Sequence, residues 1–170
     1  MAYEKPTHTL NQIDKAGKAI LDPLQALEGI EVLNSWRVAH RYPLNALHMT
    51  LRNRSKRIDG NAVTAQRLKR LESVVRKLHR QPTLHMSQMQ DIGGCRAVLS
   101  TMNRVNMSRF MYETNPLRHK LQRTRDYISD PKDDGYRSVH LIYRFVGKAT
   151  LSPGNRLWIE IQLRTSMQHA

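Results

Sequence analysis

The stretch that decides the fold of this chain is RDYISDPKDDGYRSVH (Arg125–His140), read together with WIEIQLRT (Trp158–Thr165). From Ile159 to Arg164 of the second segment, apolar residues alternate strictly with polar ones, which are Glu160, Gln162 and Arg164. Alternation with a period of two is typical of a strand that packs one face and leaves the other face free. The sequence therefore predicts a β-sheet with a polar face available for chemistry.

The first segment carries turn signals between two expected strands, at Asp130-Pro131 and at Asp133–Gly135. A loop held between strands is well placed to present side chains to a ligand. Four side chains of this region suit that purpose: Lys132, Tyr136, Arg137 and His140. The ordinary alternatives are a strand-edge tyrosine at 136 and a hydrogen-bonded sheet histidine at 140.

The rest of the chain reads as a succession of helices and strands. The patterns predict strands at Ile92–Leu99, Leu121–Ser129, Ser138–Val146 and Leu157–Arg164, the last two joined by a hairpin at Ser152–Asn155. They predict helices at Asn11–Leu21, Leu24–Ala39, Leu44–Leu51, Val63–Arg80 and Thr101–Asn115, with a break at Arg41–Pro43. The expected fold class is α/β (α+β), with a mixed, mostly antiparallel sheet of about four or five strands flanked by helices.

Composition narrows the class of protein. The chain has 170 residues, of which 39% are hydrophobic, and this suits one domain with a real core. It has no apolar run long enough to cross a membrane, and its start, MAYEKPTHTL, lacks the apolar core of a signal peptide. The single cysteine, Cys95, cannot form an internal disulfide. We therefore expect a cytoplasmic protein with no membrane partner.

Charge is the strongest compositional feature. The formal net charge is +14, and a field of that sign attracts polyanions such as nucleotides and nucleic acids. The segment Leu51–Arg80 holds ten basic and two acidic residues, so it carries over half of the net charge. A solvated helix face explains any one of these cations, but the cluster as a whole favours an anion-binding site.

The clearest expected helix is Val63–Arg80. Apolar residues recur in it at spacings of three and four, namely Leu68, Leu71, Val75 and Leu78. Lys69, Ser73 and Lys77 follow a similar spacing on another face. A row of cations with a hydroxyl on one rigid helix can bind a polyphosphate.

Two acidic residues are candidates for a metal site. Asp91 precedes Gly93 and Gly94, which loosen the entry into a buried strand and let a ligand approach the backbone. Glu160 lies in the middle of another expected strand. Two carboxylates from one sheet can hold Mg²⁺, which often keeps only one or two protein carboxylates and binds substrate phosphates as well.

These segments resemble one family. DIGGCR at Asp91–Arg96, DYI..PK..GYRSVH, EIQ.RT...HA and the pattern R.K...S...K resemble the motifs of RelA/SpoT-type alarmone synthetase domains, in the family's order. The resemblance runs from about Arg67 to Ala170 and implies a nucleotidyltransferase-like synthetase fold. We therefore divide the chain into an N-terminal helical region, 1–60, and a synthetase-like domain, 61–170. The family moves a pyrophosphate group from ATP to a ribose 3′-hydroxyl, which makes this chain an expected ATP-dependent diphosphotransferase.

The resemblance also implies roles for individual residues. Asp91 and Glu160 match the metal-binding acids, and we expect both to be catalytic. The expected ATP-binding residues are Arg67, Lys69, Ser73, Lys77 and Arg96, the last near the adenine. The expected acceptor-binding residues are Lys132, Tyr136, His140 and Gln162, to which we add Arg137 from its place in the same loop. Mg²⁺ is the expected cofactor.

Three functions compete at this point. The first is an alarmone synthetase with GDP or GTP as the acceptor. The second is the same transfer to the 3′ end of tRNA, as in the family's toxic branch, and the charge of +14 favours it. The third is an inactive basic module that binds RNA or protein, against which the presence of Asp91 and Glu160 argues.

Other features concern regulation and the extent of the domain. No His-Asp dyad of the type used by the family's hydrolase domains occurs, so we expect no degradation of the product. The chain stops at Ala170, where the family continues the helix that begins near Thr165, so we expect a trimmed C-terminal helix. An antitoxin or a C-terminal regulatory segment is a further expected kind of partner.

Overall fold

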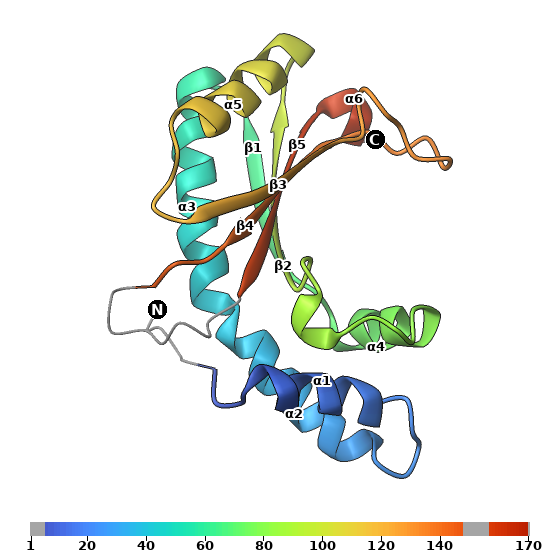
Figure 1. The fold of residues 1–170 in the computed structure, drawn as a ribbon. Coiled ribbons are helices and arrows are strands. Elements are labelled where there is room, and N and C mark those ends of the chain that lie inside the picture. Colours follow the sequence, from blue (N-terminus) through green and yellow to red (C-terminus); the bar gives the residue numbers. More distant parts are fainter. Residues whose placement is uncertain (1–5, 148–156, 170) are drawn as a thin grey trace.

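A five-stranded mixed sheet forms the centre of the molecule, which was studied as a computed structural model (Figure 1). The structure describes residues 6–147 and 157–169. The strands are β1 (Val63–Leu68), β2 (Gly93–Leu99), β3 (Lys120–Asp126), β4 (Val139–Arg144) and β5 (Trp158–Thr165). Their order across the sheet is β1-β2-β5-β4-β3, and only the β2–β5 pair is parallel. The predicted fold class and the mostly antiparallel sheet are confirmed.

The helices occupy both sides of this sheet and its lower end. They are α1 (Leu10–Ala19), α2 (Ala26–Ala39), α3 (Arg41–Ile58), α4 (Leu71–Arg80), α5 (Met102–Thr114) and α6 (Ser166–His169), with a short 3₁₀ helix, η1, at Met86–Gln88. Figure 1 shows α3 and α5 along one side of the sheet, α4 on the other side, and α1 and α2 below it.

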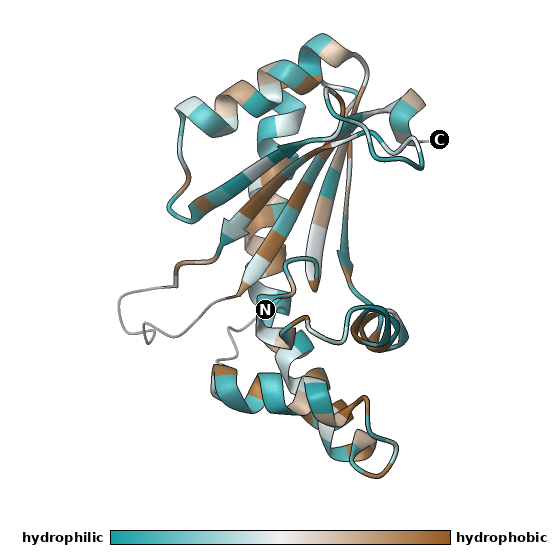
Figure 2. Ribbon diagram, turned by 45° about the vertical axis from the view of Figure 1, so that its right-hand side comes forward, coloured by the Kyte–Doolittle hydropathy of each residue, from teal (hydrophilic) through white to brown (hydrophobic). Residues whose placement is uncertain are grey.

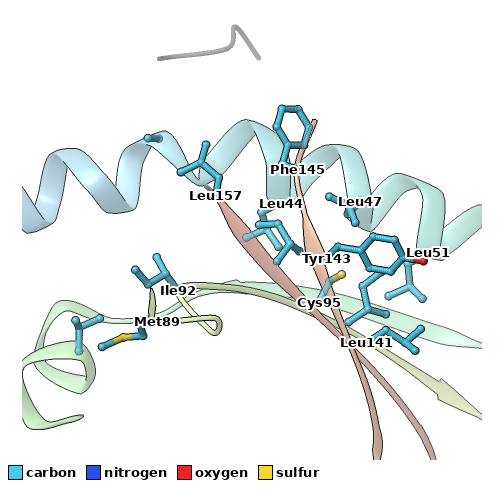
Figure 3. Packing of buried hydrophobic residues seen from close by; sticks show 14 of the residues in the cluster. Leu44, Leu47, Leu51, Met89, Ile92, Cys95, Leu141, Tyr143, Phe145 and Leu157 are labelled. Atoms are coloured by element: carbon cyan, nitrogen blue, oxygen red, sulfur yellow. The ribbon is translucent and has the colours of Figure 1, made fainter. Parts of the chain in front are cut away.

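The covered face of the sheet packs against α3 (Figure 3). Leu44, Leu47 and Leu51 of α3 are buried and lie near Cys95 and Tyr143 of the sheet. Burial of apolar surface at this contact fixes which face of each strand is covered, because strand side chains alternate between faces. The other face remains open and polar.

The register places the polar side chains of neighbouring strands in rows on the open face. Glu160 of β5 lies opposite Gly94 of β2, and Gln162 lies between Arg96 of β2 and His140 of β4. Figure 2 shows the corresponding alternation of hydrophilic and hydrophobic bands along the strands. The alternation seen in the sequence of β5 is therefore used as predicted.

One predicted element is wrong. Val63–Arg80 is not a single helix, because Val63–Leu68 forms strand β1 and the helix α4 begins only at Leu71. β1 pairs with β2 from Val63 opposite Val98 to Leu68 opposite Gly93. The helical spacing of apolar residues is used only from Leu71 onward, because the residues before it pair with a distant strand. The β-branched residues Val63 and Thr64 favour the strand.

A second prediction also needs correction. Arg41–Pro43 does not break the helical pattern, because α3 begins at Arg41 and continues to Ile58. A proline in the first turn of a helix is tolerated, since its missing N–H has no partner within the helix there. A turn follows α3 at Gly60 and Asn61, and the predicted hairpin turn at Ser152–Asn155 lies outside the described residues. Among the described residues, no helix is long and apolar enough to span a membrane.

Close packing of α1 against α2 at Gly29 gives a first testable prediction. A Cβ at this position would lie 2.7 Å from the backbone oxygen of Ala16 and 2.7 Å from Cγ1 of Ile20. Alanine in a helix gains about 1 kcal/mol over glycine, but overpacking against backbone costs about 1–3 kcal/mol. We expect Gly29→Ala to lower the free energy of unfolding by about 1–2 kcal/mol in urea denaturation.

Gly60 is the matched control for this substitution. An added Cβ there meets nothing within 4 Å. Gly60→Ala should therefore leave the free energy of unfolding unchanged or raise it by up to about 1 kcal/mol. A Gly29→Ala variant as stable as the wild type would contradict the packing described.

Candidate functional site

Two cavities lie on the open face of the sheet. The first has a volume of about 400 Å³ and the second about 800 Å³. The same four side chains line both: Asp91, Tyr136, Glu160 and Gln162. A molecule in one cavity is therefore next to a molecule in the other, with two carboxylates at the junction.

Glu160 is held by hydrogen bonds from two neighbours. His140 Nδ1 lies 3.2 Å from Glu160 Oε2, and the amide of Gln162 donates to Glu160 Oε1. Burial raises the pKa of Glu160, and so does the negative charge of Asp91, but the interactions with His140 and Gln162 outweigh both. The pKa of Glu160 consequently lies below its ordinary value, and this carboxylate is ionised at neutral pH.

Asp91 follows η1 and lies between two lysines. Lys69 Nζ donates to Asp91 Oδ2 at 2.8 Å, and Lys77 Nζ donates to Asp91 Oδ1 at 2.9 Å. Burial acts to raise the pKa of Asp91, but the hydrogen bonds and charges of the two lysines lower it overall. Asp91 is therefore also ionised at neutral pH.

An aromatic cluster forms one wall of the second cavity. The Tyr136 hydroxyl lies 2.9 Å from His140 Nε2, and the ring of Tyr127 packs edge-on against both of these side chains. Lys132 Nζ lies 4.6 Å from the Tyr127 ring centre and 4.9 Å from that of Tyr136. Burial raises the pKa of Tyr136, so its phenol stays protonated and the ring offers a neutral face for stacking.

Four cations line the first cavity: Arg67, Lys69, Arg96 and Arg164. Arg96 projects from β2 beside Gln162 of β5, and Arg67 lies opposite Gly94 on the edge strand β1. Among the described residues, two carboxylates line this cavity, Asp91 and Glu160. The cavity is therefore net positive and suits a highly charged anion.

Most of the predicted site residues line these cavities, but from partly different elements than expected. Arg67 lies on a strand and Lys69 precedes α4, so the predicted row on one helix does not exist. Lys77 lines the second cavity but not the first, and Ser73 lines neither cavity. Arg137 also lines neither cavity, and its guanidinium donates to the backbone oxygen of Ile128 at 3.4 Å.

The two adjacent glycines have different functions. A Cβ at Gly93 would lie 2.7 Å from Ile159 Cδ1 and close to Leu44, so this glycine faces the core. Gly94 lines the first cavity, and a Cβ added there would lie 3.8 Å from the nearest atom, the backbone oxygen of Glu160. Only Gly94 is therefore placed to let a ligand approach the backbone.

Sequence reasoning assigned no role to several residues that line the cavities. They are Arg125, Tyr127, Trp158 and Arg164. Arg164 was detectable, because it continues the alternation of Glu160 and Gln162 on one strand face. Arg125 and Tyr127 gave no comparable signal, since only the pairing of β3 with β4 brings them beside His140.

The two carboxylates of the site are suitable ligands for a magnesium ion. Asp91 and Glu160 are both ionised and line the same two cavities, and Mg²⁺ prefers such oxygen ligands. Each carboxylate oxygen has a second lone pair beyond the hydrogen bond that it accepts. Within residues 6–147 and 157–169, no group of three or more His, Cys, Asp or Glu could hold a metal. Further ligands would therefore come from water or a bound phosphate.

The arrangement as a whole suits transfer of a charged group between two bound molecules. The first cavity is rich in cations, and the second combines aromatic rings with Lys132 and Arg125. Between them lie two ionised carboxylates, one of which is hydrogen-bonded to a histidine. Neutralising a polyphosphate and positioning an in-line nucleophile are the main requirements of phosphoryl-type transfer.

Comparison with known proteins identifies similar sequences. A family model described as "Region found in RelA / SpoT proteins" matches residues 66–170. GTP pyrophosphokinase YwaC of Bacillus subtilis (strain 168) is 35% identical in an alignment of 111 residues, and the match covers 60% of this chain and 50% of the relative. The chain spans about half the length of the curated relatives that it matches.

Solved structures show the same fold. Small alarmone synthetase 2 from Bacillus subtilis has a TM-score of 0.62 at 28% identity, covering 78% of this chain and 72% of that chain. Small alarmone synthetase 1 from Bacillus subtilis, bound to its product pppGpp, has a TM-score of 0.66 at 23% identity, covering 76% of this chain and 70% of that chain.

Proposed function

The chain belongs to the RelA/SpoT family, and from this premise we propose that it is a Mg²⁺-dependent pyrophosphokinase that uses ATP as the donor. The acceptor is the ribose 3′-hydroxyl of GDP or GTP, and the products are AMP and an alarmone of the (p)ppGpp type. The observation that carries the proposal is the pair of cavities that share Asp91 and Glu160. The domain division 1–60 and 61–170 and a cytoplasmic location remain parts of this proposal.

ATP is assigned to the first cavity. The cations that line it make this cavity net positive, which suits a triphosphate. Lys69, which is hydrogen-bonded to Asp91, is placed to bind the phosphates next to the two carboxylates. Lys77, on the other side of Asp91, faces the second cavity and is placed to bind the phosphates being transferred. Charge-assisted hydrogen bonds of this type are roughly twice as strong as neutral ones.

The guanine nucleotide is assigned to the second cavity. Its base stacks on Tyr136, a contact of about 1–3 kcal/mol per base. Lys132 lies over the neighbouring tyrosine rings and reaches toward the acceptor phosphates, as does Arg125 at the same wall. Gln162 and His140 lie beside Glu160 and orient the ribose.

In the transfer step, the 3′-oxygen attacks the β-phosphorus of ATP. A bond forms between this oxygen and the β-phosphorus, and the bond from the β-phosphorus to the oxygen of AMP breaks. Glu160 accepts the proton of the hydroxyl, and the hydrogen bond from His140 keeps its carboxylate oriented. Mg²⁺ held by Asp91 and Glu160 would supply charge neutralisation on the phosphate oxygens.

A second candidate acceptor is the 3′ end of tRNA. The pairing of β3 with β4 places Lys120, Arg123, Arg125 and Arg144 on the same face as His140. Of these, Lys120, Arg123 and Arg144 form no ion pair within the described part of the chain. This stripe of cations leads away from the second cavity and suits a longer chain of phosphates than one nucleotide carries.

An acceptor assay tests both candidates. Purified protein would be incubated with Mg²⁺, ATP labelled on its terminal phosphate, and GDP, GTP, unlabelled ATP or bulk tRNA in separate reactions. We expect label on GDP or GTP, and no effect of replacing Arg123 and Arg144 together by glutamate. Label on tRNA alone, lost in that double variant, would assign the tRNA acceptor instead. Transfer to none of them would contradict the proposal and favour an inactive binding module.

A further inference from the structure

Arg164 is a buried cation that lacks a partner. The residue is 8% exposed, its Nε is buried without a hydrogen-bond partner, and within residues 6–147 and 157–169 its guanidinium forms no ion pair. Burial lowers the pKa of Arg164, the positive charge of Arg96 lowers it further, and Tyr136 acts in the opposite direction. Leaving Nε buried without an acceptor costs free energy, and the described part of the chain offers no contact that offsets this cost.

The position of Arg164 within the first cavity is defined by the strand that carries it. Glu160, Gln162 and Arg164 line the cavity in that order along β5. Four residues of strand separate Glu160 from Arg164, a distance of ~13 Å between their Cα atoms. Arg164 therefore lies at the end of the cavity away from the carboxylates, diagonally across from Arg96 on β2.

We propose that Arg164 binds the base of the donor nucleotide. The inference rests on the proposed function, which assigns a nucleoside triphosphate to the first cavity. The triphosphate lies by Asp91 and Lys69 at one end, so the ribose and base extend toward the other end. Ring nitrogens of a purine accept hydrogen bonds, and the guanidinium of Arg164, which lines this cavity, offers only donors, so its cavity-facing nitrogens gain an acceptor from the base.

This function is distinct from that of Lys69 in the same cavity. Lys69 is paired with Asp91 and neutralises phosphate charge at the junction. Arg164 lies on the same face of β5 as Glu160 but at the opposite end of the first cavity, so it contributes to donor binding and not to the transfer step. Removing it should raise the KM for ATP while kcat and the KM for GDP change little.

Calorimetric titration with a non-hydrolysable ATP analogue, AMPCPP, tests the proposal without requiring transfer. We expect Arg164→Met to weaken analogue binding about 10- to 100-fold, as for loss of a hydrogen bond to a charged group. Binding of inorganic tripolyphosphate, which has no base, should be unchanged. The ligand-free variant should melt at the same temperature as the wild type or higher, because an unpaired buried charge has been removed.

Two further variants complete the test. Arg57→Met removes the same charge from the exposed surface of α3 and should leave analogue binding unchanged. Arg164→Lys keeps the charge but loses the planar fork, so it should bind the analogue with intermediate affinity.

Several outcomes would overturn the inference. They are unchanged analogue binding in Arg164→Met, an equal loss of tripolyphosphate binding, or no analogue binding by the wild-type protein. A lowered melting temperature with unchanged affinity would show a structural function. If the wild type binds the analogue in an Arg164-dependent way but transfers no label to any acceptor, this inference stands and the proposed function fails.

Discussion

Replacing Glu160 by glutamine should reduce pyrophosphate transfer about 10³-fold or more. The substitution removes the negative charge at the junction of the two cavities and the group that accepts the hydroxyl proton. Glutamine has nearly the same shape and can still accept a hydrogen bond from Gln162. The loss should therefore appear in kcat, measured as release of AMP with GDP as the acceptor, with little change in melting temperature.

The pH dependence follows from the same geometry. The pKa of Glu160 lies below its ordinary value, so the carboxylate stays ionised until the pH falls below the usual carboxyl range. The rate of transfer by the wild type should consequently not change with pH near neutrality through the ionisation of Glu160, and it should fall in acid, where Glu160 becomes protonated. Glu31→Gln, an exposed change of the same type on α2, is the control and should keep full activity. A Glu160→Gln variant that retains a tenth of the wild-type rate would refute the assigned function of this residue.

Replacing Asp91 by asparagine should have the second largest effect, and it should act through magnesium. Asparagine lacks the charge of one of the two carboxylates that fit the ion. We expect the Mg²⁺ concentration for half-maximal transfer to rise about 100-fold and the rate at saturating Mg²⁺ to fall at least tenfold. A magnesium titration of the transfer rate measures both quantities.

The substitution also breaks the contacts of Asp91 with Lys69 and Lys77. These side chains are partly exposed, so the lost ion pairs are worth less than about 1 kcal/mol each. The free energy of unfolding in urea should therefore change little, which separates a catalytic loss from unfolding. An unchanged magnesium requirement in Asp91→Asn would show that this carboxylate does not bind the ion.

Part of the site could be predicted from the sequence because its signal is local. The alternation along β5 depends only on strand geometry, so Glu160 and Gln162 could be placed on one face from residue order alone. The turn-forming residues before β4 likewise predicted the loop that carries Lys132 and Tyr136. Asp91 and Glu160 could be paired in advance only through the family resemblance, since they lie far apart in the chain.

Other features required contacts between distant segments. β1 was expected to be helical, because its residues alone do not reveal the partner strand β2 with which they form hydrogen bonds. For the same reason Arg67 was assigned to the wrong element, although it still lines the first cavity. Arg137 is adjacent to Tyr136 in the sequence, but neighbouring residues diverge in direction, and it lines neither cavity.

The sequence by itself determined the strands around the motifs, the fold class and the identity of most candidate groups. The tertiary structure alone decided which groups share a cavity, that the Nε of Arg164 is buried without a partner in the described part of the chain, and that Gly93 faces the core while Gly94 lines the first cavity. The physical reason is that side-chain direction along a strand is a local property with a fixed period. The register between strands and the covering of one face depend on hydrogen bonds and apolar contacts between residues far apart in the chain.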